Sequence, residues 1–227
     1  MDFFKLVKSL DELVFEVLSW LYFYPRTLWR VLVRPFALMD DTARQMGEDD
    51  DPAFGDRIGP PLFLALTLGL LHLVELGVGI DPTDSFRNDA VREMMSDDRN
   101  LLALRILLFG GLPLLAAARE VKARGGRIDK GSLRGPFFAQ CYAAAGFAVL
   151  YDVGGFTVPL TEGHGGDMLR LAVMLGVMLL ALLWLGLVEA RYFHRELGVT
   201  RWRAVRHAAV LLVQWVLLAA VIVGLAS

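Results

Sequence analysis

The sequence predicts an all-α polytopic integral membrane protein, a bundle of five transmembrane helices with an N-terminal amphipathic interfacial helix. Hydrophobic residues make up 56% of the 227 residues, and the mean hydropathy is +0.49, whereas soluble proteins contain about 45–50% apolar residues. The charged residues gather in blocks and leave long runs nearly free of charge. The only cysteine, Cys141, excludes an internal disulfide framework and a multi-cysteine metal site.

Five segments are long and apolar enough to cross a bilayer, whose hydrocarbon core of about 30 Å takes roughly 20 helical residues. They are residues 60–80, 101–121, 136–160, 168–188 and 204–226. The third segment is the least apolar, and it carries a run of small residues at 143–146. Because small residues let helix backbones approach closely, we expect the third span at the centre of the bundle.

The distribution of lysine and arginine predicts how the chain is oriented. Residues 1–59 and the loops at 118–136 and 189–206 carry 18 of the 23 basic residues, against 3 in residues 81–100. By the positive-inside rule, the N-terminus lies in the cytoplasm and the C-terminus on the far side. Five spans, an odd number, likewise place the two termini on opposite sides of the membrane.

Residues 1–39 are predicted to form amphipathic interfacial helices on the cytoplasmic side. Apolar residues recur at helical spacing, with charged residues on the other side. The apolar stretch at 13–24 is too short to cross a membrane. Pro25 is expected to break the segment into two helices, the second over residues 26–34. Residues 40–59 are then expected to be a polar linker into the first span.

The second interfacial helix places Arg26, Arg30 and Arg34 on one face, at i, i+4 and i+8. Arginines beside Trp29 and Phe36 suit contact with the anionic headgroups of the inner leaflet. The simpler interpretation is an interfacial anchor without lipid recognition. Both interpretations name membrane lipids as partners.

Ionisable residues inside the spans form the main candidate site, because such residues are costly in a bilayer and usually functional. These residues all fall in the non-cytoplasmic half of the predicted bundle: His72, Glu75, Arg105, Asp152 and Arg170. Such an intramembrane polar cluster fits three roles, namely a proton or ion relay, a headgroup-binding site, or a structural ion-pair network. One histidine and one glutamate at i, i+3 are too few for a metal site, so no metal is expected.

Other features of the sequence argue against catalysis and against nucleic-acid binding. The chain contains no GxSxG, HExxH, Walker or strand-following GxGxxG signature, so we expect neither an enzyme nor a cofactor. The formal net charge of -2 gives no indication of a nucleic-acid partner.

Two short motifs indicate a family. The stretch FGDRIGPP matches an Asp-Leu-Tyr-Gly-Pro type motif through Asp56, Gly59 and Pro60. A second pattern in the third span is carried by Gly146, Phe147 and Pro159. With the five predicted spans, the chain resembles the bacterial branch of the Yip (Ypt/Rab-interacting) family of membrane proteins.

The resemblance is incomplete and implies a fold more than a reaction. Residues 57–58 are Arg-Ile where the motif has Leu-Tyr, and Phe147 replaces Tyr. The family fold is a cytoplasmic N-terminal region followed by five clustered helices, and its bacterial members are often called permeases without a known substrate. The first motif also has a local interpretation, in which prolines occupy the first helical turn and Asp56 caps it.

Three functions remain open at this point. The first hypothesis is a non-enzymatic Yip-like protein of the bacterial inner (cytoplasmic) membrane that binds lipid or organises other membrane proteins. The alternative is a small permease with a proton- or ion-coupled site at His72, Glu75 and Asp152. The third is an accessory subunit of a larger membrane complex. A homo-oligomer is compatible with each of them.

Overall fold

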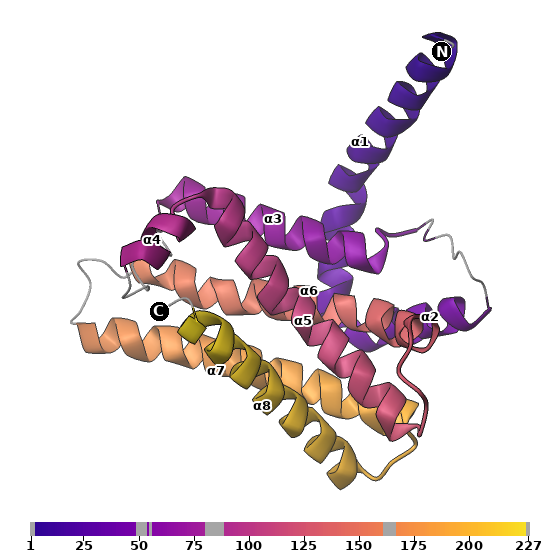
Figure 1. Cartoon of the computed structure of the whole chain (residues 1–227), viewed down its shortest axis with the longest axis vertical. Helices are drawn as coiled ribbons and strands as arrows, with labels where there is room; N and C mark the ends of the chain where they lie inside the picture. The colour runs from indigo at the N-terminus through magenta and orange to yellow at the C-terminus, as the bar shows by residue number, and fades with distance from the viewer. Residues whose placement is uncertain (1–2, 49–53, 55, 80–88, 161–166, 226–227) are drawn as a thin grey trace.

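The computed structural model describes residues 3–48, 54, 56–79, 89–160 and 167–225, and this part of the chain is helical without strands (Figure 1). The helices are α1 (Phe3–Val33), α2 (Pro35–Glu48), α3 (Pro60–Val78), α4 (Asp89–Met95), α5 (Asp98–Ala123), α6 (Lys130–Leu160), α7 (Asp167–Glu196) and α8 (Arg201–Leu225). Five of them, α3 and α5–α8, are long and apolar enough to span a membrane, so the predicted fold class is confirmed.

Helix α6 lies at the centre of the bundle, as the small residues of the third span predicted. It contacts α1, α2, α3, α5 and α7, and 67% of its apolar window is buried, against 17–33% for the other four spans. Gly146 explains the close approach, because a Cβ built there would lie 2.7 Å from Trp184 of α7 and 2.8 Å from Val31 of α1. At this point the side chains of Trp184 and Val31 pack directly on the backbone of α6.

Several spans extend beyond the apolar windows at one end of the bundle. Helix α6 begins at Lys130 instead of residue 136, and α7 continues to Glu196 instead of ending at 188. Asp129 and Ser132 fix the start of α6, because the Asp129 carboxylate accepts from the Ser132 amide at 2.9 Å and the Ser132 hydroxyl accepts from the Asp129 amide at 3.0 Å. The hydrogen bond from the Ser132 amide lowers the pKa of Asp129. An apolar window ends at the first charged residues, but the backbone hydrogen bonds of the helix continue through them.

Helices α1 and α2, called the collar below, differ from the prediction in two respects. Helix α1 continues through Pro25 to Val33, so the predicted break at Pro25 is wrong. Packing compensates for the backbone hydrogen bond that proline removes, since Thr27 and Val31 beyond it are buried and the Tyr24 hydroxyl donates to Thr67 of α3 at 3.2 Å. Helix α2 runs from Pro35 to Glu48, so residues 40–48 are helix and not linker.

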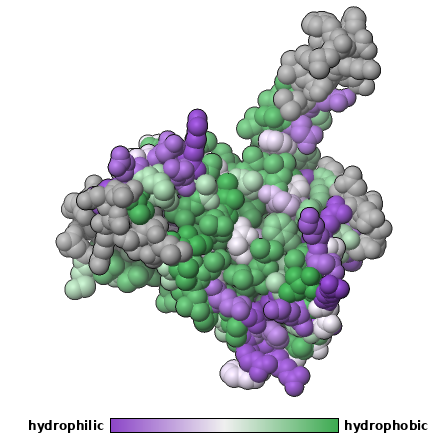
Figure 2. Space-filling view, viewed as in Figure 1, coloured by the Kyte–Doolittle hydropathy of each residue, from purple (hydrophilic) through white to green (hydrophobic). Residues whose placement is uncertain are grey.

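Helix α1 crosses the spans, whereas α2 lies beside the start of α6 (Figure 1). The C-terminal half of α1 and all of α2 pack on the bundle, whereas the N-terminal half of α1 projects beyond it. The end of the bundle that holds α2, the start of α6 and the end of α7 is called the collar end below. Hydrophobic side chains cover the body of the bundle, and hydrophilic side chains gather toward its ends (Figure 2), the distribution that a bilayer requires.

The contact at Gly146 generates the first prediction. Gly146→Ala should lower the free energy of unfolding by about 1–3 kcal/mol, because the added methyl group meets Trp184 and Val31 at less than 3 Å. Thermal unfolding of the purified protein in detergent measures this. Gly155→Ala on the same helix is the control, since its Cβ would meet nothing within 4 Å. Equal melting temperatures of the two variants would contradict the tight three-helix contact.

Candidate functional site

A charged cluster of His72 and Glu75 from α3, Arg105 from α5 and Asp152 from α6 lies inside the bundle, away from the collar end. The Arg105 guanidinium donates to the Glu75 carboxylate through Nη2, and the same Nη2 lies 3.0 Å from Oδ2 of Asp152. All three side chains are largely buried, with Asp152 only 5% exposed. One guanidinium therefore joins two carboxylates from different helices. The three residues are 30 or more positions apart in the sequence, so their contact could not be read from local spacing.

The charged cluster lines one side of a pocket of about 180 Å³. His72 lines this pocket with the two acids and Arg105, and the remaining lining is apolar or aromatic. His72 Nε2 and Arg105 Nη1 are buried without a hydrogen-bond partner. Two carboxylates and one guanidinium carry one excess negative charge when all are ionised. The arrangement can therefore hold a proton or water. The side chain of Arg170, the fifth residue of the predicted site, lies outside the described residues.

A second buried polar group lies toward the collar end and is called the carboxylate cluster. Gln140 Nε2 of α6 donates to Glu189 Oε2 of α7 at 3.1 Å. Glu120 of α5 pairs with Arg124 at 2.8 Å, and both glutamates are at least 99% buried. Oxygen atoms of both glutamates and the Tyr192 hydroxyl have no hydrogen-bond partner. The sequence analysis missed Glu120 because it lies at the edge of a predicted span. Its i, i+4 spacing to Arg124 could have indicated the ion pair.

Arg119 of α5 and Arg191 of α7 lie at the same end of the bundle, but both are engaged by other residues than Glu189. Arg119 donates to Gln214 of α8 at 2.6 Å, and the Arg191 guanidinium lies 4.8 Å from the centre of the Phe36 ring. Glu189 thus relies on an amide donor for its contact with α6.

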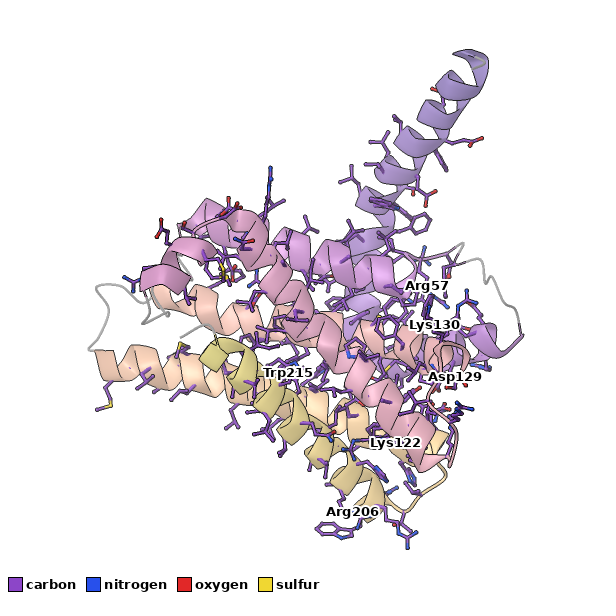
Figure 3. All side chains as sticks on the ribbon, in the orientation of Figure 1. Arg57, Lys122, Asp129, Lys130, Arg206 and Trp215 are labelled. Atoms are coloured by element: carbon purple, nitrogen blue, oxygen red, sulfur yellow. The ribbon has the colours of Figure 1, made fainter. Side chains whose placement is uncertain are left out.

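The predicted motif segment is held by Arg57, a residue that the sequence analysis did not single out. The Arg57 side chain is 1% exposed and lies 2.5 Å from Asp41 of α2, and it donates to Gln45 at 3.1 Å. The Tyr142 hydroxyl of α6 donates to the Ile58 carbonyl at 2.7 Å. Figure 3 shows Arg57 beside the start of α3, with Lys130 and Asp129 at the same end of the bundle and Lys122 and Arg206 at the ends of α5 and α8.

Asp56 does not cap α3, so that prediction is wrong. The N-cap is Gly59, which makes no side-chain capping hydrogen bond, although the prolines do occupy the first turn. Asp56 instead accepts from Arg30 of α1 at 3.0 Å. Burial raises the pKa of Asp56, but the Arg30 hydrogen bond and the charges of Arg57 and Arg30 outweigh it and lower the pKa. The ion pair therefore ties the segment before the first span to the collar.

The remaining residues of the predicted sites fall in two places. Among the three collar arginines, Arg30 is engaged by Asp56, whereas Arg26 and Arg34 are exposed. Gly146 and Phe147 lie in the core of α6. Pro159 lies within α6, with its side chain outside the described residues.

Comparison with protein-family models, with curated proteins and with solved structures finds no match. The resemblance to the Yip family therefore stays a hypothesis that depends on the motif residues and the five-span architecture.

The charged cluster generates the second prediction. Arg105→Met should destabilise the protein by about 3 kcal/mol, because it leaves Glu75 and Asp152 buried without a counter-charge. Adding Glu75→Gln and Asp152→Asn to that variant should restore much of the loss, since the neutral amides need no guanidinium. Thermal unfolding in detergent compares the variants. A single variant as stable as the parent protein would show that the three charges are not coupled.

Proposed function

We propose that this chain is a non-enzymatic, Yip-like protein of the bacterial inner membrane whose collar binds anionic lipid. The observation that carries the proposal is an exposed stripe along α1, whose members are spaced three or four residues apart. The stripe consists of Phe15, Leu18, Tyr22, Arg26, Trp29 and Val33. Its apolar members are between 54% and 74% exposed. Aromatic rings interleaved with arginine are the composition of a helix at headgroup level.

The opposite face of α1 supports this orientation of the stripe. Thr27 and Val31 are buried against the bundle, and Tyr24 bonds to α3. A helix fixed across the spans in this way lies parallel to the membrane plane and turns its other face toward the lipid surface. The excess of basic residues at the collar end favours the cytoplasmic leaflet, whose anionic lipids attract arginine at about 1 kcal/mol per residue.

A second candidate function is a small permease, which the pocket at the charged cluster favours. His72, Glu75 and Asp152 line one pocket within the spans, and such intramembrane ionisable groups are typical of proton relays. The absence of an evident internal repeat in the sequence counts against a permease that works as a single chain.

The lipid-binding proposal predicts a loss of lipid selectivity when the exposed arginines are removed. Arg26→Gln with Arg34→Gln should lower the enrichment of spin-labelled phosphatidylglycerol over phosphatidylcholine around the reconstituted protein severalfold, because two charges at the headgroups are lost. Electron paramagnetic resonance measures this, and high salt should reduce the difference between the parent protein and the variant. Arg99→Gln, an exposed arginine at the other end of the bundle, is the control. Selectivity that survives the double substitution at low salt would contradict the proposal.

The permease alternative predicts proton movement in vesicles of the reconstituted protein. A pH-sensitive dye should report proton flux under an imposed membrane potential, and Glu75→Gln with Asp152→Asn should abolish it because neither amide titrates. Asp11→Asn with Glu16→Gln, on the projecting half of α1, is the control with the same charge change. Flux no greater than in empty vesicles, or unchanged in the double variant, would leave the charged cluster with a structural role.

A further inference from the structure

A groove of about 860 Å³ lies between the collar and helices α7 and α8. One wall is the elbow at residues 32–36, where α1 ends and α2 begins, and the other walls come from α7 and α8. The apolar part of the lining includes Leu32, Phe36, Trp184, Leu187 and Val205, and the basic part consists of Arg191, His194, Arg195 and Arg201. Aspartate and glutamate are absent from the described lining.

The two kinds of side chain occupy different depths in the groove. The basic residues lie at the last turns of α7 and the first residue of α8, where these spans reach the membrane surface. Trp184 lies seven residues before Arg191 on α7, which places it about 10 Å deeper along the helix axis. The groove therefore changes from cationic to apolar along the direction of the bilayer normal.

The positive charge in the groove is only partly compensated. Arg195 pairs with Asp40 of α2 at 2.6 Å. Arg191 lies over the Phe36 ring, which leaves its N–H groups without a carboxylate in the described part of the chain. Arg201 is exposed and likewise has no carboxylate partner among the described residues. Two guanidinium groups thus face one groove with free donors.

We propose that this groove binds one anionic phospholipid, with its phosphate at Arg191 and Arg201 and its acyl chains along Trp184 and Leu187. Guanidinium groups match phosphate oxygens in charge and in donor geometry. The apolar walls select a phospholipid over a free anion, because a soluble phosphate leaves Trp184 and Leu187 uncovered. Basic pockets between spans at the membrane surface are typical sites for such headgroups.

This inference rests on the proposed function for its ligand class, but its basic residues lie outside the exposed stripe of α1. Surface attachment through the stripe involves many exchanging lipids, whereas the groove holds a single lipid between the collar and two spans. A bound lipid would therefore join the elbow to α7 and α8 and stabilise the folded chain by mass action.

Native mass spectrometry of the full chain in mild detergent, titrated with phosphatidylglycerol, tests the groove. We expect one tightly bound lipid per chain and about a tenfold loss of affinity in the variant with Arg191→Gln and Arg201→Gln, because charge-assisted hydrogen bonds are removed. Arg203→Gln is the matched control, since Arg203 is exposed two residues along the same helix and does not line the groove. Equal affinity in the double variant, or an equal loss in the control, would overturn the proposal.

Further arms separate the possible ligands and the two proposals. Val205→Trp should also weaken the single adduct by filling the groove without changing its charge, and a full-strength adduct in this variant would overturn the site. Inorganic phosphate should fail to displace the lipid, and displacement at millimolar phosphate would overturn the assignment to a phospholipid.

Arg26→Gln with Arg34→Gln should keep the single adduct even where lipid selectivity in vesicles is lost. Loss of the adduct in this collar variant alone would likewise overturn the assignment to the groove.

Discussion

The packing of the collar and of α7 depends on the close approach that the small residues of α6 allow. Around Gly146, backbone meets Trp184 on one side and Val31 on the other, and the neighbouring alanines are fully buried. In a bilayer no hydrophobic force drives helices together, so such van der Waals contact is a principal source of association. The collar is thereby fixed to a helix long and apolar enough to span the membrane, and the contact at Val31 sets the direction in which α1 crosses the bundle.

The same helix carries a polar residue toward each end, and each requires a partner from a neighbouring span. Asp152 meets Arg105 and Glu75, whereas Gln140 donates to Glu189. Burying these groups without partners costs several kcal/mol, so the two clusters constrain how α3, α5 and α7 rotate about α6. Packing sets the distance between the helices, and the polar contacts set which faces meet.

The sequence predicted the features that depend on local patterns, namely the five spans and the central place of the third. It also placed the ionisable residues at a common depth, which is why Glu75, Arg105 and Asp152 were grouped before any contact was visible. It missed features that depend on distant partners. Pro25 was expected to end a helix, but packing on α3 and α6 maintains that helix. Arg57 is buried because Asp41 and Gln45 of α2, more than ten residues earlier in the sequence, pack against it. Neither the continuous helix at Pro25 nor the burial of Arg57 produces a periodic pattern that the sequence could show.

The elbow between α1 and α2 connects the packing of α6 to events at the membrane surface. Pro35 lacks the N–H that α1 would need to continue, so α2 begins there in a new direction and Phe36 lies against Arg191. Stacking on a ring satisfies the guanidinium face but leaves its edge donors free. A phosphate bound as proposed would accept from those donors as well as from Arg201, and it would bind more tightly while Phe36 of the docked collar holds Arg191 in place. A lipid bound in this groove would therefore be coupled to the position of the collar, in the reciprocal way that linkage requires.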